Sequence, residues 1–195
     1  IPLLIGVDQE GGLVDRMPPE VHRTPGAYAV GSTSYWDQGR ALGAALAAEC
    51  AGFGFHLDFA PVLDVWSNPD NTVIGKRAFG SDWKVVSGFG AAVSNALQAA
   101  GVIPVVKHFP GHGDTVVDSH MGLPVVDKSL EDLSLQELPP FRDLISGGET
   151  PSGRAEAVPA VMVAHILMTQ LDPDLPASLS PAVVTDLLRG ELGFG

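Results

Sequence analysis

Residues 102–120 read VIPVVKHFPGHGDTVVDSH, and this stretch predicts a buried strand followed by a reactive loop. Its first five residues are apolar, which is typical of a strand inside a parallel sheet. The fourteen residues from Lys107 to His120 then contain three of the six histidines of the chain and two aspartates. A structural core does not need so many titratable groups, so we interpret this loop as part of a reaction centre.

Three other apolar runs have the character of strands, and helical patterns separate them. The apolar runs are residues 1–7, 53–65 and 158–164, and the helical patterns are residues 37–50, 81–101, 129–145 and 180–190. The chain therefore alternates strand and helix four times, at a spacing of about 50 residues. This alternation predicts a parallel sheet whose faces are covered by helices.

Local signals mark the ends of several of these helices. The pair Ser81-Asp82 can cap the start of the second helix. Ser129 opens the sequence SLEDL, which is close to a capping box, and the pair Pro139-Pro140 should kink or split the helix that follows. We expect residues 146–156 to form a polar linker.

In all four units the first polar side chains follow the carboxyl end of the strand, at Asp8, at Asp64, at Lys107 with His108, and at His165. In a (β/α)8 barrel this edge of the sheet carries the active site, and an open doubly wound sheet also binds its ligand there. However, no Gly-x-Gly-x-x-Gly follows a strand and no Walker motif is present. A barrel therefore fits the sequence better than a nucleotide-binding sheet.

We predict an α/β fold, namely a partial TIM-like (β/α)8 barrel with about four βα units, that occupies residues 1–195 as a single domain. The chain is shorter than the roughly 250 residues typical of this barrel. Half a barrel leaves two open sheet edges. We therefore expect the isolated chain to need the missing half of the barrel, or to associate with another copy, for stability.

The composition excludes several classes of protein. A formal net charge of −12 argues against a nucleic-acid partner, because phosphate binding needs clustered lysines and arginines. No apolar run approaches the roughly 20 residues of a membrane span. Cys50 is the only cysteine, so neither an intrachain disulfide nor a cysteine-based zinc site can form.

With these motifs assembled, the chain resembles glycoside hydrolase family 3, specifically the β-N-acetylglucosaminidase branch that trims peptidoglycan fragments. The similarity covers essentially all 195 residues and is carried, in order, by GVDQEGGLVDRM, DFAPVLDV, NPDNTVIGKRAFGSD, KHFPGHGDTVVDSH and LRGELGFG. KHFPGHG is the most specific of these motifs because it combines rare residues at a fixed spacing. The first domain of this family is a TIM-like barrel, which agrees with the strand and helix count.

The resemblance implies a retaining exo-β-N-acetylglucosaminidase whose substrate is a carbohydrate and which needs no cofactor and no metal. The residues that it implies for binding the N-acetylglucosamine ring are Asp8, Arg16, Arg77, Lys107 and His108. A carboxylate can bridge two hydroxyls, while lysine and arginine donate to hydroxyl and amide oxygens.

The resemblance also implies that His120 is the general acid/base and that Asp118 orients it. A two-residue gap in an extended loop puts both side chains on one side. The carboxylate can then fix the imidazole tautomer, as the acidic member of a Ser-His-Asp triad does. An Asp-x-His pair marks the N-acetylglucosaminidase branch, and most other glycosidases use a second carboxylate instead.

The sequence departs from the family pattern at two places. Leu13 stands where the family usually has arginine after Glu-Gly-Gly, although Arg16 is retained. The family nucleophile is an aspartate on the strand after the ELGF segment, and Gly195 comes just before that strand. Retaining chemistry needs such a carboxylate, so we expect it beyond Gly195.

Three other functions stay open at this point. The first is a phosphorylase of the same family, because histidine does not repel an incoming phosphate as a carboxylate would. The second is a metal-dependent hydrolase with His108, His112, His120 and an aspartate as ligands, although the spacing matches neither His-Glu-x-x-His nor a zinc finger. The third is a non-catalytic sugar-binding domain.

Several polar residues have less specific predictions. We expect His112 and Asp114 to shape the loop more than to touch the substrate. His165 is expected to line the pocket without transferring a proton, and Asp58 and Asp64 to have structural or supporting roles.

Overall fold

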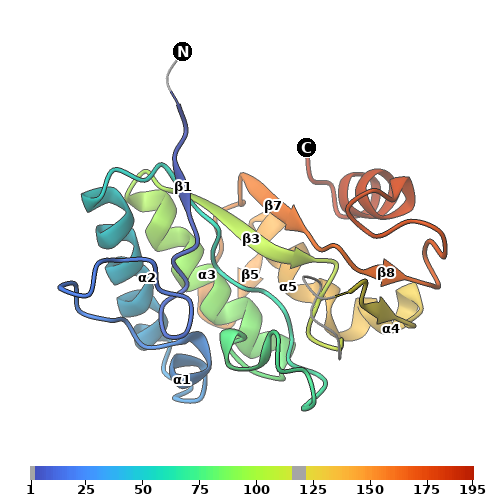
Figure 1. Cartoon of the computed structure of the whole chain (residues 1–195), viewed down its shortest axis with the longest axis horizontal. Coiled ribbons are helices and arrows are strands. Elements are labelled where there is room, and N and C mark those ends of the chain that lie inside the picture. Colours follow the sequence, from blue (N-terminus) through green and yellow to red (C-terminus); the bar gives the residue numbers. More distant parts are fainter. Residues whose placement is uncertain (1–2, 116–121) are drawn as a thin grey trace.

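The computed structural model describes residues 3–115 and 122–195, and its centre is a four-stranded parallel sheet (Figure 1). The strands in spatial order are β1 (Gly6–Val7), β2 (Leu57–Asp58), β3 (Ile103–Phe109) and β7 (Ala160–Val163). Every neighbouring pair is parallel, with Leu57 opposite Ile103 and Val106 opposite Val161. The order of strands in space thus follows their order in the chain, which is the arrangement of a β/α barrel.

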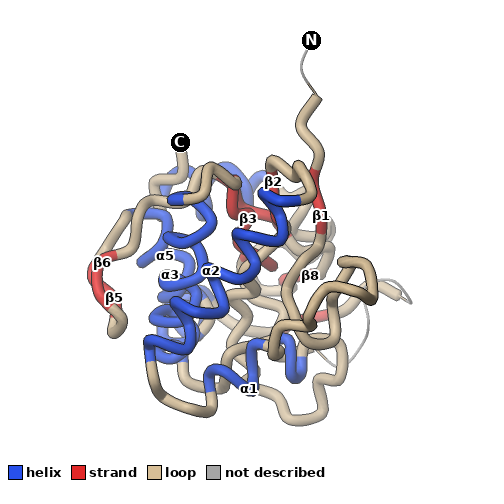
Figure 2. Tube along the Cα trace, turned by 90° about the vertical axis from the view of Figure 1, so that its left-hand side faces the viewer, coloured by secondary structure: helices blue, strands red, loops and turns tan. Residues whose placement is uncertain are grey.

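Three helices cover one face of this sheet, as Figures 1 and 2 both show. They are α2 (Trp36–Gly52), α3 (Trp83–Ala99) and α5 (Leu138–Ser146). The remaining helical segments are α1 (Ala27–Gly31), the 3-10 turn Gly75–Arg77, α4 (Leu130–Gln136) and the C-terminal helix Ala182–Glu191, which has π-type winding. The described part of the chain is therefore a partial TIM-like barrel, as the sequence predicts.

The central helix α3 is buried on most of its surface because it packs against the sheet, α2 and α5. Two glycines of α2 let these helices approach closely. A Cβ atom on Gly43 would lie 2.9 Å from the Cα of Val93, and one on Gly39 would lie 2.6 Å from the Phe89 ring. Phe89 in turn stacks on Phe79, with 5.6 Å between the ring centroids. This packing fixes the helix layer against which the strands are aligned.

The helix boundaries agree with the capping signals. Asp82 caps α3, since its side chain accepts the backbone N–H of Lys84 at 2.9 Å. Ser129 and Asp132 form a complete capping box at the start of α4. The helix expected over residues 129–145 is split, and α5 begins at Leu138 with the two prolines in its first turn, where a missing N–H costs little.

Two expectations for the chain between the helices are wrong. The run 53–65 contains only a two-residue strand, β2, and one isolated bridge that pairs Val62 with Lys107. Residues 146–156 are not a plain linker, because they contain an antiparallel hairpin of β5 (Glu149–Thr150) and β6 (Gly153–Arg154). Gly153 has a φ of 117°, a conformation that glycine adopts readily and other residues do not. A second small parallel pair joins β4 (Val125–Val126) to β8 (Leu167–Met168).

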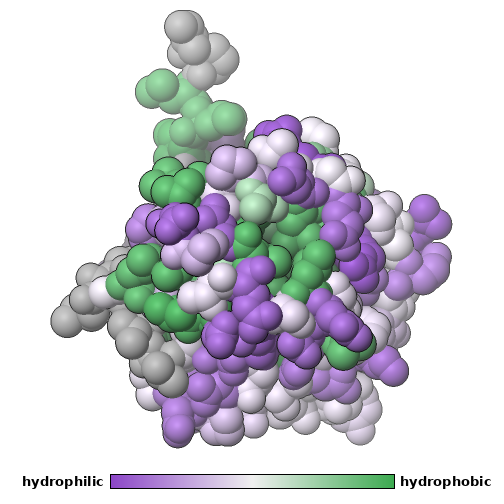
Figure 3. Space-filling model, turned by 90° about the vertical axis from the view of Figure 1, so that its right-hand side faces the viewer, coloured by the Kyte–Doolittle hydropathy of each residue, from purple (hydrophilic) through white to green (hydrophobic). Residues whose placement is uncertain are grey.

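The strands β1 and β7 form the two edges of the four-stranded sheet. All four residues of β7 are only partly buried. Figure 3 looks at the molecule from the side of the C-terminal helix, on the right in Figure 1, and shows apolar side chains in a hollow that polar side chains surround. None of the helices that the structure describes is long and apolar enough to cross a lipid bilayer.

Candidate active site

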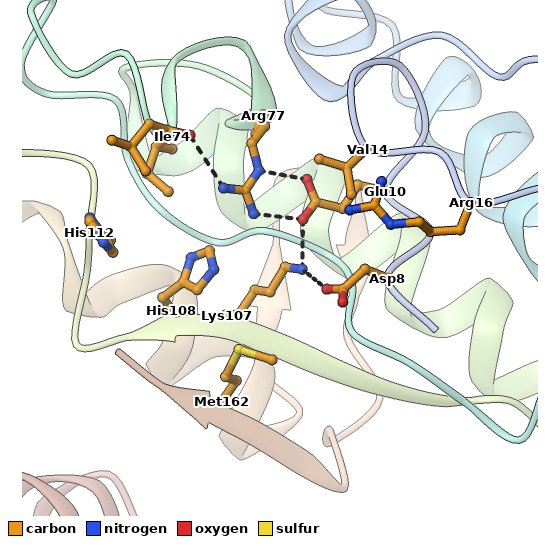
Figure 4. Close-up of a pocket in the computed structure, with 11 residues that line it drawn as sticks. Asp8, Glu10, Val14, Arg16, Ile74, Arg77, Lys107, His108, His112 and Met162 are labelled. Atoms are coloured by element: carbon orange, nitrogen blue, oxygen red, sulfur yellow. Dashed lines mark hydrogen bonds and ion pairs between the residues drawn. The ribbon is translucent and has the colours of Figure 1, made fainter. Parts of the chain in front are cut away.

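A pocket of about 390 Å³ opens at the carboxyl ends of the strands (Figure 4). Its walls come from the segments after β1 and β2, from β3 and from β7. The lining residues are Asp8, Glu10, Val14, Arg16, Val73, Ile74, Arg77, Lys107, His108, His112 and Met162. All five residues that the sequence comparison with the family predicts for sugar binding are among them. The tertiary structure therefore brings these five side chains together, although Asp8 and His108 lie 100 positions apart in the chain.

Lys107 lies at the floor of the pocket, and its side chain is only 2% exposed. Its Nζ contacts Asp8 Oδ1 at 2.8 Å and Glu10 Oε1 at 2.6 Å. The register of β3 against β7 shifts between Lys107 and Phe109, and the Lys107–His108 peptide bond is cis. At such a bulge two consecutive side chains can face the same side, and here both Lys107 and His108 line the pocket.

Glu10 is the centre of the charged cluster, and it is not among the residues predicted from the sequence. Its carboxylate accepts two hydrogen bonds from Arg77, from Nε at 2.9 Å and from Nη2 at 2.7 Å, in addition to the contact with Lys107. Burial raises the pKa of Glu10, but the hydrogen bond from Arg77 and the charges of both cations outweigh it, so the pKa lies below its usual value. The sequence does contain one signal for Glu10. It follows Asp8 by two positions in an extended segment, so the two carboxylates point to the same side of the chain.

Asp64 is fully buried beneath the pocket and holds the loop that contains the histidines. Its Oδ2 is 2.6 Å from Nδ1 of His108, and its Oδ1 accepts the backbone N–H of His112 at 2.7 Å. Burial tends to raise the pKa of Asp64, but the neighbouring His108 lowers it below the usual value. Gly113 packs directly against the backbone of Val65, where a side chain would collide. The supporting role predicted for Asp64 is therefore that of an anchor for this loop.

His112 shapes the loop, as predicted, and also lines the pocket. Its carbonyl accepts the side-chain amide of Asn71 at 2.7 Å, and its Nδ1 is 2.7 Å from the hydroxyl of Thr115. Burial lowers the pKa of His112, so the ring is neutral at neutral pH. The carboxylate of Asp114 pairs with Lys128 at 3.3 Å, which fixes the same loop from its other side.

The sequence profile of the glycosyl hydrolase family 3 N-terminal domain matches residues 1–195. The chain belongs to glycoside hydrolase family 3. It is 40% identical to beta-hexosaminidase A of Pseudoalteromonas piscicida and 41% identical to beta-hexosaminidase LpqI of Mycobacterium tuberculosis, and covers 34% and 48% of those proteins. All of this chain is aligned in both cases.

A solved structure of a glycoside hydrolase family 3 beta-N-acetylglucosaminidase from Paenibacillus sp. str. FPU-7 has the same fold, with a TM-score of 0.92 and 42% identity. The similarity covers 100% of this chain and 35% of that one. The family 3 domain described here therefore spans about a third to a half of the length of these relatives.

The predicted acid/base pair lies outside the described residues of the family 3 domain. Asp118 and His120 both fall within residues 116–121. The hypothetical metal site also includes His120, so its proposed ligand set falls partly outside the described residues. No group of three or more potential metal ligands occurs among residues 3–115 and 122–195.

The prediction for His165 is wrong. Its side chain is exposed, its Nδ1 is 2.8 Å from the hydroxyl of Ser178, and it is not among the residues that line the pocket. β7 ends at Val163, and the chain then runs on towards β8. His165 therefore lies in the connection between these two strands, where its ring contacts Ser178 and not the pocket.

Asp58 supports the pocket from behind. It is fully buried at the end of β2, and its Oδ1 accepts the backbone N–H of Gln9 at 2.9 Å, between the two carboxylates Asp8 and Glu10. Burial raises the pKa of Asp58 to about 7, against the opposing effects of the Gln9 N–H and the charge of Lys107. Asp58 therefore ties the segment after β1 to β2 and changes its charge near neutral pH.

The raised pKa of Asp58 predicts a pH-dependent stability that Asp58→Asn should remove. The unfolded chain ionises this group near pH 4 and the folded chain only near pH 7, so the folded state loses stability as the pH rises through that window. Between pH 5 and pH 8 the wild type should lose about 2–3 kcal/mol of unfolding free energy relative to Asp58→Asn. Urea denaturation at several pH values measures this difference. Asp37→Asn, at a side chain that is 93% exposed, is the control and should show the wild-type slope; the same slope in Asp58→Asn would contradict the prediction.

Proposed function

We propose that this domain is the sugar-binding part of a retaining exo-β-N-acetylglucosaminidase that removes terminal β-linked N-acetylglucosamine from muropeptides or similar saccharides. The observation that supports this proposal best is the pocket itself, which combines all five predicted binding residues in a chain about 40% identical to beta-hexosaminidases.

The charge balance of the pocket suits an uncharged, hydroxyl-rich ligand. Three cations line it, and two of them, Lys107 and Arg77, are already paired with carboxylates of the pocket. Side chains that are held in fixed ion pairs present donors and acceptors in defined directions, as recognition of a sugar ring requires. Asp8 keeps 45% of its side chain exposed, so its carboxylate can accept hydrogen bonds from hydroxyls.

Arg16 is the pocket cation with the most freedom to bind a ligand. Its backbone N–H donates to Gln9 Oε1 at 2.8 Å, which fixes the position of the residue. Among the described residues its guanidinium makes no hydrogen bond or ion pair. This group can therefore donate to an amide or hydroxyl oxygen of the sugar without breaking an interaction of the protein.

In the proposed reaction His120 protonates the glycosidic oxygen and then activates a water molecule, while Asp118 orients the imidazole. A carboxylate nucleophile, predicted beyond Gly195, forms the glycosyl-enzyme intermediate. Asp8, Arg16, Arg77, Lys107 and His108 hold the ring during both steps.

The test is an assay of an intact enzyme that contains this domain, with aryl N-acetyl-β-glucosaminide and aryl β-glucoside as substrates. We expect kcat/KM to favour the N-acetylated sugar by about 100-fold or more, because a site built for polar groups rejects a ligand that lacks them. Free N-acetylglucosamine should be released both with and without inorganic phosphate. Release of the sugar 1-phosphate in phosphate buffer would identify a phosphorylase instead, and binding without turnover would identify a sugar-binding protein.

A pair of arginine variants tests whether this pocket is the binding site. Arg16→Met should raise KM by about 10-fold to 100-fold, because a hydrogen bond from a charged donor contributes roughly 1.5–3 kcal/mol. Arg40→Met is the matched control, since Arg40 lies on α2 and, within the described part of the chain, pairs only with exposed Asp37 and a backbone carbonyl. An equal KM for both variants would show that the sugar binds elsewhere.

A further inference from the structure

His108 and Asp64 form a buried pair at the floor of the pocket, and their backbones hold them side by side. The N–H of Leu63 donates to the carbonyl of Lys107 at 2.5 Å, so the next residues of the two segments, Asp64 and His108, are adjacent. The distance from Oδ2 of Asp64 to Nδ1 of His108 is 2.6 Å. Water has little access to this pair, because Asp64 is fully buried and the His108 side chain is only 16% exposed.

The other hydrogen bonds of Asp64 keep it in the ionised form that only accepts. Its Oδ1 accepts two backbone N–H groups, from His112 at 2.7 Å and from His108 at 3.3 Å. The pKa of Asp64 is lowered, although its burial acts in the opposite direction, because His108 and the backbone N–H of His112 favour the anion. An ionised carboxylate has no proton to give, so the hydrogen bond to His108 needs the proton on Nδ1.

The position of this proton determines whether the other ring nitrogen of His108 donates a hydrogen bond to a ligand or accepts one from it. With Nδ1–H directed at Asp64, the neutral ring has its lone pair on Nε2. Nε2 makes no hydrogen bond to any residue that the structure describes, and Figure 4 shows the ring of His108 beside Lys107 in the pocket. The cations Arg16, Lys107 and Arg77 can only donate, so each sugar hydroxyl that they bind still needs an acceptor for its own proton.

We propose that Asp64 is a positioning residue that fixes His108 as the Nδ1–H tautomer, so that Nε2 faces the pocket as an acceptor for a hydroxyl of the bound sugar. His108 would then join Asp8 as an acceptor for sugar hydroxyls in the binding pocket. The role of the sugar in this inference rests on the proposed function, whereas the tautomer of His108 is a property of the chain alone.

The tautomer can be measured by NMR on the chain labelled with 15N-histidine. Protonated and unprotonated ring nitrogens have well separated 15N shifts, and a His108→Gln sample assigns the signals of His108 among the six histidines. At pH 8 we expect a proton on Nδ1 and none on Nε2. A ring that carries a proton on Nε2, in the neutral or the cationic form, would overturn the proposal even if no variant of Asp64 can be purified.

The variant Asp64→Asn tests whether Asp64 sets the tautomer of His108. Its carbonyl oxygen can keep the backbone N–H groups of residues 108 and 112, while its amide would donate to Nδ1 and move the ring proton to Nε2. Asp143→Asn is the matched control, because Asp143 is a partly buried aspartate that binds the Ser87 hydroxyl away from the pocket. We expect the tautomer to change in Asp64→Asn only. An unchanged tautomer in a folded Asp64→Asn chain would show that Asp64 does not set it.

Addition of N-acetylglucosamine separates this proposal from the proposed function. If the sugar is bound, the Nε2 signal of His108 should shift and that of His165 should not, because His165 lies outside the pocket lining. A sugar that shifts the His112 resonances but leaves Nε2 of His108 unchanged would overturn the acceptor role, because His112 also lines the pocket. If no resonance of the pocket shifts at all, the proposed function fails, and the tautomer measurement still decides the role of Asp64.

Discussion

Replacing His120 with alanine should reduce the turnover of N-acetylglucosaminides with poor leaving groups by about 10²–10⁴-fold, which is the usual contribution of a general acid. An activated aryl glycoside leaves without protonation, so its first step should change far less. The measurement is kcat for a disaccharide and for a nitrophenyl glycoside in an intact enzyme that contains this domain. Asp118→Asn should cause a smaller loss of the same kind, because it disturbs only the orientation and tautomer of the imidazole.

The control for this experiment is His165→Ala. His165 is exposed and lies outside the pocket lining, so its removal should leave both rates unchanged. If His120→Ala lowers the rates of the good and the poor leaving group equally, then His120 does not act as the acid. The pocket would then still be the proposed binding site, but another residue would have to act as the general acid.

Glu10→Ala should destabilise the folded chain by about 3–5 kcal/mol, the range for breaking a buried ion pair by removal of one partner. The Lys107 side chain is 2% exposed and that of Arg77 is 21% exposed, so both charges would lose their shared carboxylate with little access to water. Asp8 remains as a partner for Lys107, which favours the lower end of the range. For a chain of this length we expect a fall in Tm on the order of 10 °C.

The matched control is Glu149→Ala. Glu149 pairs with Arg154 at 3.7 Å on the surface, with both side chains about three-quarters exposed, and such pairs contribute roughly 0–1 kcal/mol. Urea denaturation of both variants gives the comparison. Because the pKa of Glu10 is lowered, its contribution is present at neutral pH and is lost as the pH falls below the ordinary carboxylate range, so the effect of Glu10→Ala should shrink in acid. An effect equal to that of Glu149→Ala at neutral pH would mean that the cluster does not stabilise the fold.

A double-mutant cycle identifies which partner carries the effect of Glu10. Arg77→Met removes the two hydrogen bonds to Glu10 and leaves Lys107 in place. If the bidentate pair carries the stabilisation, the two substitutions should be strongly non-additive. Additive losses would assign the stabilisation to Lys107 instead.

Local sequence patterns and motifs were enough to predict the class of the fold and most of the polar residues that line the pocket. Apolar runs that alternate with helical patterns predicted the parallel sheet, since strands buried on both faces must be apolar throughout their length. The caps at Asp82 and Ser129 were predictable because a cap depends on residues within one turn of the helix. The five predicted binding residues could be named because each is part of a short motif, such as KHFPGHG, whose spacing can be compared directly with the family.

Which of these residues interact with one another depends on how the chain folds and could not be read from the sequence. Glu10 meets Lys107 and Arg77, and Asp64 meets His108, across separations of 44 to 97 positions, so no local pattern indicates these pairs. The hairpin within residues 146–156 and the direction of His165 also depend on how the chain packs around the sheet. The physical reason is that local sequence sets strand and helix formation, whereas the order and register of the strands set which distant charges share one buried pocket.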